Sequence, residues 1–270
     1  MFLTLAFPAI DPVLIQLGPF AIRWYSLAYM AGLILGWLLM RKLAMRTGGV
    51  VTRDHTDDFL TWATVGVILG GRLGYVLFYK FGFYLENPAS IFAVWQGGMS
   101  FHGGFTGVVV ATILFTRKHK IPLLLFADLL ACAAPIGLFF GRIANFINGE
   151  LFGRASDAPW AVIFPNGGPY PRHPSQLYEA ALEGLVLFVI LMMLTRLPRV
   201  TSRPGILTGV FMAGYGIARA IVEMFRQPDA HIGLLSGGST MGQMLSIPMI
   251  LVGVGFILYA MRHGSPAKKT

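Results

Sequence analysis

Apolar stretches of about 20 residues recur along the whole chain, and each is long enough to cross the hydrocarbon core of a bilayer as a helix. Of the 270 residues, 55% are hydrophobic and only 12% are charged, whereas a soluble domain carries roughly 25% charged residues. A water-soluble fold of this length could not cover so much apolar surface with so few charges. Irregular backbone cannot face lipid with its polar groups unpaired. The chain is therefore predicted to be an all-α polytopic membrane protein.

Hydropathy predicts seven transmembrane helices. They cover residues 20–40, 59–79, 96–116, 123–143, 177–195, 205–225 and 242–261. Small residues spaced four apart let two membrane helices approach closely. Such pairs occur at Gly66/Gly70, Gly103/Gly107 and Gly205/Gly209. The prediction is a closely packed bundle that forms a single membrane domain from residue 1 to residue 270.

The orientation of these spans follows from their basic residues, because cytoplasmic loops are enriched in Lys and Arg. Thirteen basic residues follow spans 1, 3, 5 and 7, among them Arg41, Arg117 and Arg196. The opposite loops hold only Lys80, Arg154 and Arg172 away from the helix ends. The N-terminus is therefore predicted to lie outside and the C-terminus inside.

Residues 149–172, between the fourth and fifth predicted spans, are numerous enough to have a shape of their own. This segment is rich in Gly, Pro and aromatic residues, and residues 160–164 form a short apolar run. Turn residues around such a run are typical of short strands. The segment is predicted to form a small β-containing head on the outer, periplasmic face. Residues 173–176 then look like a helix start with Pro174 near the first turn.

The cysteine count and the net charge exclude several classes of site. Cys132 is the only cysteine, so the chain can form neither an internal disulfide nor a cysteine-cluster metal site. Its apolar neighbours favour a packing role over a nucleophilic one. The net charge of +9 would suggest a nucleic-acid partner in a soluble protein, but here the charges mark the cytoplasmic loops. We expect no nucleic-acid partner and no metal site.

Five arginines remain within or at the edge of predicted spans. They are Arg23, Arg72, Arg142, Arg219 and Arg226. An arginine at the centre of a membrane helix costs about 2.5–3.5 kcal/mol on insertion scales. Such residues should therefore face a polar cavity and meet anions. Most of them fall in the outer half of the bilayer, at the level where His102 opens the third span.

Helical spacing brings some of these charges together. Tyr215, Arg219 and Glu223 are spaced i, i+4, i+8 and so share one face of the sixth span. Arg219 and Glu223 could simply neutralise each other within a packed bundle. Glu150 is the other acid nearest to the remaining arginines, including Arg142, and two acids are too few for all of them. The sequence thus predicts a surplus of buried positive charge.

A phosphate suits that surplus, because a guanidinium group donates paired hydrogen bonds to phosphate oxygens. A phosphate in the outer half of a bilayer is most simply the headgroup of a membrane lipid. His102, followed by Gly103 and Gly104, could act as a general base, since histidine is the side chain most readily used for this near neutral pH. It could also be a packing residue. The sequence contains no serine elbow and no metal-binding histidine pair.

Within residues 141–154, the stretch from Gly141 to Gly153 matches the pattern G-R-x-x-N-F-x-N-x-E-x-x-G at every fixed position. This pattern is the signature of the prolipoprotein diacylglyceryl transferases, which the chain resembles over nearly its whole length. The family's H-G-G segment is matched at His102. Further matches occur at residues 23–25, at residues 173–179, and at Arg219 with Glu223 and Arg226.

The resemblance implies a reaction and its partners. Members of the family transfer the sn-1,2-diacylglyceryl group of phosphatidylglycerol to the thiol of the lipobox cysteine in a prolipoprotein signal peptide. A thioether forms and glycerol 1-phosphate leaves, without a metal or organic cofactor, as the first step of lipoprotein maturation in the bacterial inner membrane. The family's functional positions fall on Tyr25, His102, Arg142, Asn145, Glu150, Gly153, Arg219 and Glu223.

The resemblance also suggests roles for these residues. Arg142 and Arg219 would bind the phosphate and stabilise the charge that develops on the leaving group. His102 would accept the thiol proton, with Glu150 as the alternative. The remaining candidates are expected to bind or orient substrate: Tyr25, Asn145, Gly153, Tyr215, Glu223, Arg226 and Arg72.

Gly153 would serve backbone geometry, because a residue without a side chain adopts conformations that others avoid.

Two other classes of function compete with the transferase. A transporter or channel could use intramembrane arginines to guide an anion. A non-catalytic scaffold would leave the surplus of buried arginines unexplained.

Overall fold

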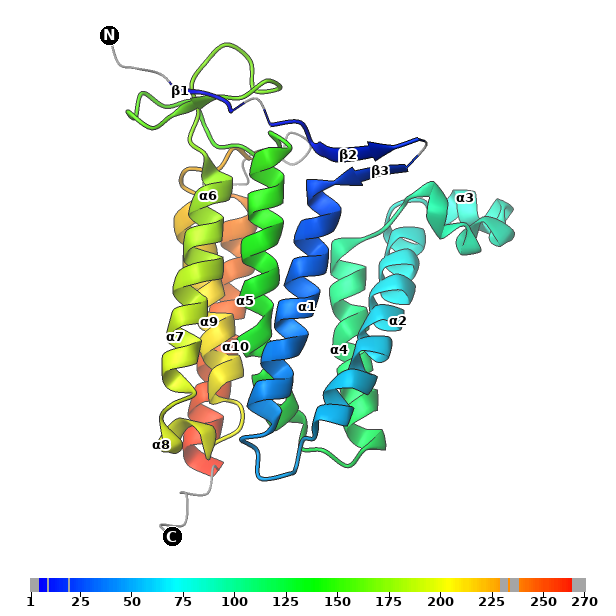
Figure 1. Cartoon of the computed structure of the whole chain (residues 1–270), viewed down its shortest axis with the longest axis vertical. Coiled ribbons are helices and arrows are strands. Elements are labelled where there is room, and N and C mark those ends of the chain that lie inside the picture. Colours follow the sequence, from blue (N-terminus) through cyan, green and yellow to red (C-terminus); the bar gives the residue numbers. More distant parts are fainter. Residues whose placement is uncertain (1–4, 9, 19, 229–232, 234–237, 264–270) are drawn as a thin grey trace. The chain divides into compact units, whose positions relative to one another are not determined.

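The computed structural model describes residues 5–8, 10–18, 20–228, 233 and 238–263. The chain forms two compact units, one built from residues 1–39 and 130–270 and the other from residues 40–129. We call them the discontinuous unit and the central unit. The boundaries fall within helices α1 (Trp24–Ala44) and α5 (Leu123–Ile147), so each of these helices contributes to both units (Figure 1).

The described residues are mostly helical. The other long helices are α2 (Arg53–Phe78), α4 (Phe101–Lys118), the continuous run of α6 (Ser175–Glu179), η3 (Ala180–Val186) and α7 (Leu187–Leu194), α9 (Ile206–Val222) and α10 (Met241–His263). Short helical segments are α3 (Phe81–Glu86), η1 (Pro88–Phe92), η2 (Val94–Gln96) and α8 (Pro198–Thr201).

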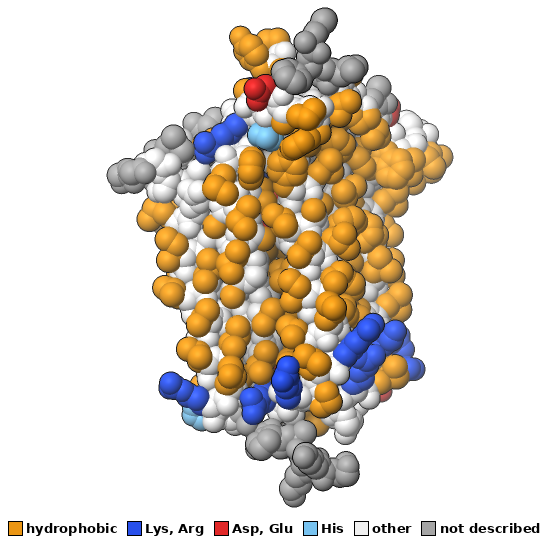
Figure 2. Space-filling model, turned by 90° about the vertical axis from the view of Figure 1, so that its left-hand side faces the viewer, with side chains coloured by type: hydrophobic (Ala, Val, Ile, Leu, Met, Phe, Trp, Pro, Cys, Tyr) orange, Lys and Arg blue, Asp and Glu red, His pale blue; other side chains and the backbone are white. Residues whose placement is uncertain are grey.

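Five of these helices are long and apolar enough to cross a membrane: α1, α2, α5, α10 and the run Ser175–Leu194. Helix α9 is apolar but has 17 residues. Large apolar side chains point outward along the helices, with Leu33 of α1 62% exposed and Leu251 of α10 66% exposed. On the face drawn in Figure 2, apolar side chains cover most of the helix length, and most Lys and Arg side chains lie near one end. The chain is an integral membrane protein.

Glycines determine how the helices of the central unit pack. A Cβ atom added to Gly74 would lie 2.7 Å from the Cα of Gly103, and one added to Gly70 would lie 2.8 Å from the Cα of Gly107. The backbones of α2 and α4 therefore touch along this line, as the spacing of small residues predicted. Gly103 therefore serves the close packing of α4 against α2.

In the discontinuous unit, glycines also allow close packing of α9 against α10, which run side by side (Figure 1). A Cβ on Gly209 would lie 2.6 Å from the carbonyl oxygen of Gly253. Gly205, the other glycine of the predicted small-residue pair, instead caps the N-terminus of α9 with a φ of 105°, a conformation that favours glycine. Cys132 of α5 is fully buried, which agrees with a packing role.

Short strands lie outside the helices. Strand β4 (Val162–Ile163), within the predicted head, pairs in parallel with β1 (Leu5–Ala6). Strands β2 (Val13–Leu17) and β3 (Phe20–Arg23) form an antiparallel hairpin before α1. The head segment therefore contains β structure as predicted. The first membrane helix was predicted from residue 20, but it begins only at Trp24. Arg23, predicted within or at the edge of a span, therefore lies at the end of β3, directly before α1.

Candidate active site

Six charged side chains form one connected network in the discontinuous unit. They are Arg142 of α5, Glu179 at the end of α6, Glu183 of η3, Arg219 of α9, Glu223 at the C-cap of α9, and Arg226 just beyond it. Their side chains are between 0% and 18% exposed. Three guanidinium groups thus meet three carboxylates in a largely buried place.

Glu179 lies at the centre of this network. Its Oε1 atom is 2.5 Å from Nη1 of Arg219 and 2.9 Å from Nη1 of Arg226, and its Oε2 atom is 3.2 Å from Nε of Arg142. The side chain is completely buried. One carboxylate therefore fixes three arginines from two separate parts of the chain, α5 and the end of α9. Charge-assisted contacts of this kind are stronger than neutral hydrogen bonds.

The other two glutamates bind the arginines differently. Glu223 pairs closely with Arg219 through its Oε1 atom and lies 3.9 Å from Nε of Arg226. Glu183 makes only long contacts, at 3.6 Å to Nη2 of Arg142 and 3.9 Å to Nη1 of Arg219. Both of its oxygens are buried and accept no hydrogen bond from the described residues. Glu183 is thus the least compensated acid of the network.

The backbone around Glu183 is held by a close helix contact. Glu183 lies in η3, a π-helical segment, and π-helical turns are rare and often occur at functional sites. A Cβ on the next residue, Gly184, would lie 2.9 Å from the Cα of Phe139 in α5. Phe139 is three residues before Arg142 and shares its helix face. The contact at Gly184 therefore brings Glu183 beside Arg142.

The network changes one conclusion drawn from the sequence. The expected surplus of buried positive charge counted only Glu150 and Glu223 as nearby acids, and this count was wrong because it missed Glu179 and Glu183. A signal for them existed in the sequence. They are spaced i, i+4 at the start of the fifth predicted span, on one helix face and at the same predicted depth as Arg219.

The turn after α5 carries the polar residues of the signature. Glu150 accepts hydrogen bonds at Oε1 from the side-chain amides of Asn145, at 2.8 Å, and Asn148, at 3.3 Å. The carbonyl oxygen of Glu150 accepts a hydrogen bond of 2.6 Å from Nε2 of Gln176. Asn145 is 8% exposed. This turn is therefore fixed to the first turn of α6, close to Glu179.

Two candidate tyrosines belong to the same unit. The hydroxyl of Tyr25 lies 3.0 Å from that of Tyr29, and Tyr25 is near enough to Arg142 and Glu150 to interact with their charges. Tyr215, one turn before Arg219 on α9, lies within the same electrostatic range of Arg219, Arg142 and Glu183. Both tyrosines are therefore near enough to Arg142 to interact with its charge.

Gly153 brings the signature turn against the end of α9. Its N–H donates to the carbonyl oxygen of His173 at 2.8 Å, and a Cβ at this position would lie 2.5 Å from the carbonyl oxygen of Phe225. The next residue, Arg154, donates from Nε to the carbonyl oxygen of Arg226 at 3.0 Å. Gly153 is therefore required because there is no space for a side chain. The expected reason, an unusual backbone conformation, was wrong, since Gly153 is not among the described residues with positive φ.

His102 and Arg72 belong to the central unit. His102 is an exposed residue in the first turn of α4, after the N-cap Ser100. It lines a cavity of about 810 Å³ between α2 and α4, together with residues such as Leu73 and Thr106. The part of His102 in the proposed chemistry stays a prediction.

Arg72 is 4% exposed, and its guanidinium group is held mainly by backbone oxygens. Its guanidinium group donates to five carbonyl oxygens of the connection that follows α3, those of Ser90, Ile91, Ala93, Gly97 and Gly98. The same group lies 5.2 Å from the ring centre of Tyr84. Arg72 therefore organises the connection between α2 and α4. Its predicted contact with substrate stays a prediction.

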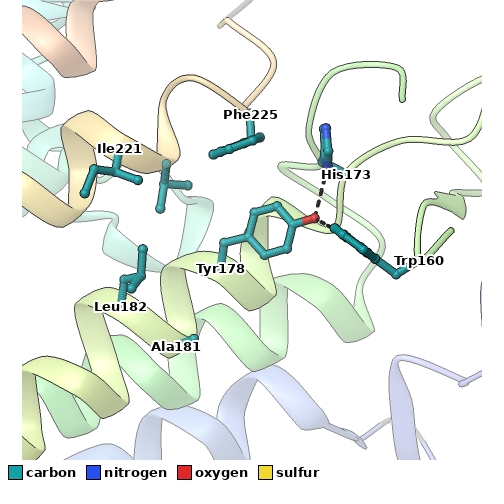
Figure 3. A pocket seen from close by; sticks show the side chains of 8 residues that line it. Trp160, His173, Tyr178, Ala181, Leu182, Ile221 and Phe225 are labelled. Carbon is teal, nitrogen blue, oxygen red and sulfur yellow. Dashed lines mark hydrogen bonds between the residues drawn. The ribbon is translucent and has the colours of Figure 1, made fainter. Parts of the chain in front are cut away.

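A small apolar cavity of about 300 Å³ lies between α6 and the end of α9. Figure 3 shows Tyr178 at its centre, with its hydroxyl between Trp160 and His173. Nε1 of Trp160 donates to this hydroxyl at 2.6 Å, and Nδ1 of His173 lies 3.0 Å from it. Burial lowers the pKa of His173, while the charge of Asp157 opposes this shift. A neutral His173 can accept the hydrogen bond of Tyr178 at Nδ1.

Comparisons with known proteins place this site in a family. A family model described as prolipoprotein diacylglyceryl transferase matches residues 12–259. A phosphatidylglycerol–prolipoprotein diacylglyceryl transferase of Paramagnetospirillum magneticum is 60% identical over 268 residues, which cover 99% of this chain and 100% of that protein. The chain belongs to the prolipoprotein diacylglyceryl transferase family. The enzymes of the same name from Azospirillum brasilense and Rhodospirillum rubrum are 59% and 57% identical over 97% of this chain, covering 98% and 96% of their own lengths.

Most of the site residues predicted from the sequence lie in the discontinuous unit of this family member. These are Tyr25, Arg142, Asn145, Glu150, Gly153, Tyr215, Arg219, Glu223 and Arg226. Glu179 and Glu183 join them although neither was a candidate. No group of three or more His, Cys, Asp or Glu side chains is placed to hold a metal ion within the described part of the chain.

Proposed function

We propose that this chain transfers the diacylglyceryl group of phosphatidylglycerol to the thiol of a prolipoprotein cysteine, and that the arginine–glutamate network is its phosphate site. The observation that carries this proposal is the convergence of Arg142, from the signature, and Arg219, from α9, on the buried carboxylate of Glu179. Three relatives that are 57–60% identical over nearly the full chain are named for this reaction.

Arg142 and Arg219 are the groups best suited to hold the lipid phosphate. A guanidinium fork matches two phosphate oxygens at once, and both arginines are partly exposed, at 18% and 16%. As the carbon–oxygen bond to the phosphate breaks, negative charge grows on the departing glycerol phosphate. Positive groups already fixed in place stabilise such charge without reorganising, and Glu179 provides that fixation.

The reaction forms a carbon–sulfur bond and breaks a carbon–oxygen bond. The cysteine thiol loses its proton to a base, the thiolate sulfur attacks the glyceryl carbon, and glycerol phosphate leaves with the bonding electron pair. His102 is our candidate for the base. Glu150 is the alternative, and its Oε1 atom already accepts hydrogen bonds from Asn145 and Asn148.

We also propose seven membrane spans in the bacterial inner membrane, with the N-terminus outside and the head segment in the periplasm. Helix α4 and helix α9 would supply the two spans beyond the five that meet the criteria of length and composition. Basic residues in the last turns of α1, α4 and α10 support this orientation. Alkaline phosphatase fused after Tyr170 should be active and fused after Lys118 inactive, and the reverse result would refute the orientation.

The function is tested by product analysis. Purified protein is incubated with phosphatidylglycerol and a peptide that contains a lipobox cysteine, and the peptide is analysed by mass spectrometry. We expect the peptide to gain one diacylglyceryl group and the solution to gain glycerol phosphate. A peptide with serine in place of the cysteine is the matched control and should stay unmodified. Intact lipid with an unmodified cysteine peptide would refute the transferase and favour a transporter.

A further inference from the structure

The network of Arg142, Glu179, Glu183, Arg219, Glu223 and Arg226 is electrically balanced when every member is charged, and this bears on how it can accept an anion. The phosphodiester of phosphatidylglycerol brings a further negative charge. An uncompensated charge in a buried place is costly, and groups usually change protonation to avoid it. Binding of the lipid phosphate should therefore be accompanied by the loss of one carboxylate charge.

Glu183 is the carboxylate best placed to lose its charge. Glu179 is held by three arginine contacts of 2.5–3.2 Å, and Glu223 pairs closely with Arg219. Glu183 has only the contacts of 3.6 and 3.9 Å, and both of its buried oxygens lack a hydrogen bond within the described residues. Protonation of Glu183 therefore removes less favourable interaction energy than protonation of Glu179 or Glu223 would.

The partners of Glu183 are the two arginines to which we assign the lipid phosphate. Its Oε2 atom faces Arg142 and its Oε1 atom faces Arg219. The ionisable groups around it are Arg142 on α5, Glu179 on α6, Tyr215 and Arg219 on α9, and Arg226 beyond α9. A phosphate that binds both arginines must compete with the Glu183 carboxylate for the same donors.

We propose that Glu183 is an exchangeable counterion: its carboxylate balances Arg142 and Arg219, and when the lipid phosphate binds them Glu183 takes up a proton from the medium. This inference rests on the proposed function, because it uses the same phosphate site. The packing of Gly184 against Phe139 holds the backbone in place. The change is therefore limited to the side chain of Glu183, which withdraws from the two arginines. Since binding takes up a proton, the affinity for phosphatidylglycerol decreases as the pH rises.

Proton uptake can be measured by calorimetric titration with phosphatidylglycerol in buffers of different ionisation enthalpy, between about pH 6 and about pH 9. Wild-type protein should take up about one proton per lipid at a pH where Glu183 is ionised. Diacylglycerol, which lacks the phosphate, should cause no uptake. Wild-type protein that binds phosphatidylglycerol without uptake at every pH would overturn the proposal, and this result needs no variant.

The variant Glu183→Gln keeps the shape of the side chain and removes its charge. It should take up no proton, should bind phosphatidylglycerol about tenfold more tightly, a change of 1.4 kcal/mol, and should lose the pH dependence of binding. The exposed Glu86→Gln is the matched control and should behave as wild type. Proton uptake unchanged in Glu183→Gln would overturn the proposal.

Failure of the proposed function would look different from failure of the counterion model. If the phosphate site itself is misplaced, Arg142→Lys will bind phosphatidylglycerol as tightly as wild type. If only the counterion model is wrong, Arg142→Lys will weaken lipid binding while Glu183→Gln takes up the same number of protons as wild type.

Discussion

Arg72 and Arg219 are both largely withdrawn from solvent in a membrane protein, yet they are compensated in opposite ways. Arg72 of the central unit donates to five backbone carbonyl oxygens. Arg219 of the discontinuous unit contacts three carboxylates, those of Glu179, Glu183 and Glu223. Backbone oxygens cannot accept a proton near neutral pH or leave the site without unfolding the loop, whereas a carboxylate can do both.

This difference separates a structural arginine, whose partners are fixed, from an arginine whose anionic partner can be exchanged. The carbonyl oxygens around Arg72 carry no net charge, so the guanidinium group keeps its positive charge within a fixed shell. The arginines around Glu179 meet anions, and another anion can replace one of them. We infer that the form of compensation, more than burial itself, indicates which buried arginines are available to a phosphate.

The largest effect is expected at the shared carboxylate. Glu179→Ala removes the common partner of Arg142, Arg219 and Arg226 and leaves buried guanidinium groups uncompensated. Loss of one partner of a buried ion pair typically costs about 3–5 kcal/mol. We expect a free energy of unfolding reduced by this amount in detergent, measured by thermal or denaturant unfolding. Glu86→Ala, on the surface, is the control. A Glu179→Ala protein as stable as the control would show that the network does not stabilise the fold.

His102→Gln should affect the rate and leave lipid binding intact, because glutamine can hydrogen-bond but is a poor proton acceptor. General bases contribute about 10²–10⁴ in rate, so we expect a loss in that range. A thiol has a pKa near 8.5, so the thiolate fraction of the substrate increases with pH. The variant should therefore recover, relative to wild type, as the pH rises from about 7 to about 9.

The pH series also contains its own control. Arg142→Lys should show no selective recovery, because its defect lies in phosphate binding. If His102→Gln binds lipid normally and shows no recovery relative to wild type, His102 is not the base. Glu150→Gln would then be tested in the same series.

Much of this architecture follows from local sequence, and the contrast between the two arginine environments does not. The spacing of Gly66/Gly70 and Gly103/Gly107 predicted close helix packing at these glycines, since membrane helices approach closely where small residues recur at fixed intervals; that α2 and α4 pack against each other is shown by the structure. Helical periodicity likewise predicted the pair of Arg219 and Glu223. Both are interactions that a short stretch of sequence specifies.

The interactions that the sequence did not predict join distant segments. Glu179 meets Arg142 and Arg226, which lie 37 and 47 positions away in the chain. Strand β1 pairs with β4 across a still longer gap, since Leu5 lies opposite Val162. Arg72 was expected to meet an anion, but it meets backbone carbonyl oxygens instead. Residue types do not reveal which backbone oxygens a loop leaves available as acceptors. Pairing partners of this kind are determined by tertiary packing.

Arg72→Lys tests the structural side of the comparison. Lysine keeps the charge but loses the planar fork that reaches several carbonyl oxygens. We expect the free energy of unfolding to decrease by about 1.5–3 kcal/mol and residues 88–98 to become sensitive to limited proteolysis. The affinity for phosphatidylglycerol should stay within about twofold of wild type, well under 1.4 kcal/mol. The exposed Lys80→Ala is the control. Weakened lipid binding with an intact loop would instead support the predicted substrate contact of Arg72.

Arg142→Lys tests the exchangeable side. The charge remains, but the paired hydrogen bonds to phosphate are lost. Since hydrogen bonds to charged groups contribute roughly 1.5–3 kcal/mol each, we expect the affinity for phosphatidylglycerol to fall by at least about tenfold. Equilibrium binding to lipid in detergent micelles measures this change. Arg117→Lys, at an exposed position, should show no loss, and equal affinity in both variants would contradict the phosphate assignment.

The smallest effect is expected at a buried position that belongs to neither kind of arginine site. Cys132 of α5 is fully buried, ten residues before Arg142, and Cys132→Ala removes only its sulfur. A typical single substitution costs about 1 kcal/mol, so the melting temperature should decrease slightly. Because the reactive sulfur belongs to the substrate peptide, the rate of transfer per folded molecule should be retained. Complete loss of activity in a stably folded Cys132→Ala protein would point to a covalent enzyme intermediate. It would refute direct transfer from lipid to thiol, in which the arginines stabilise glycerol phosphate while the substrate thiolate attacks the glyceryl carbon.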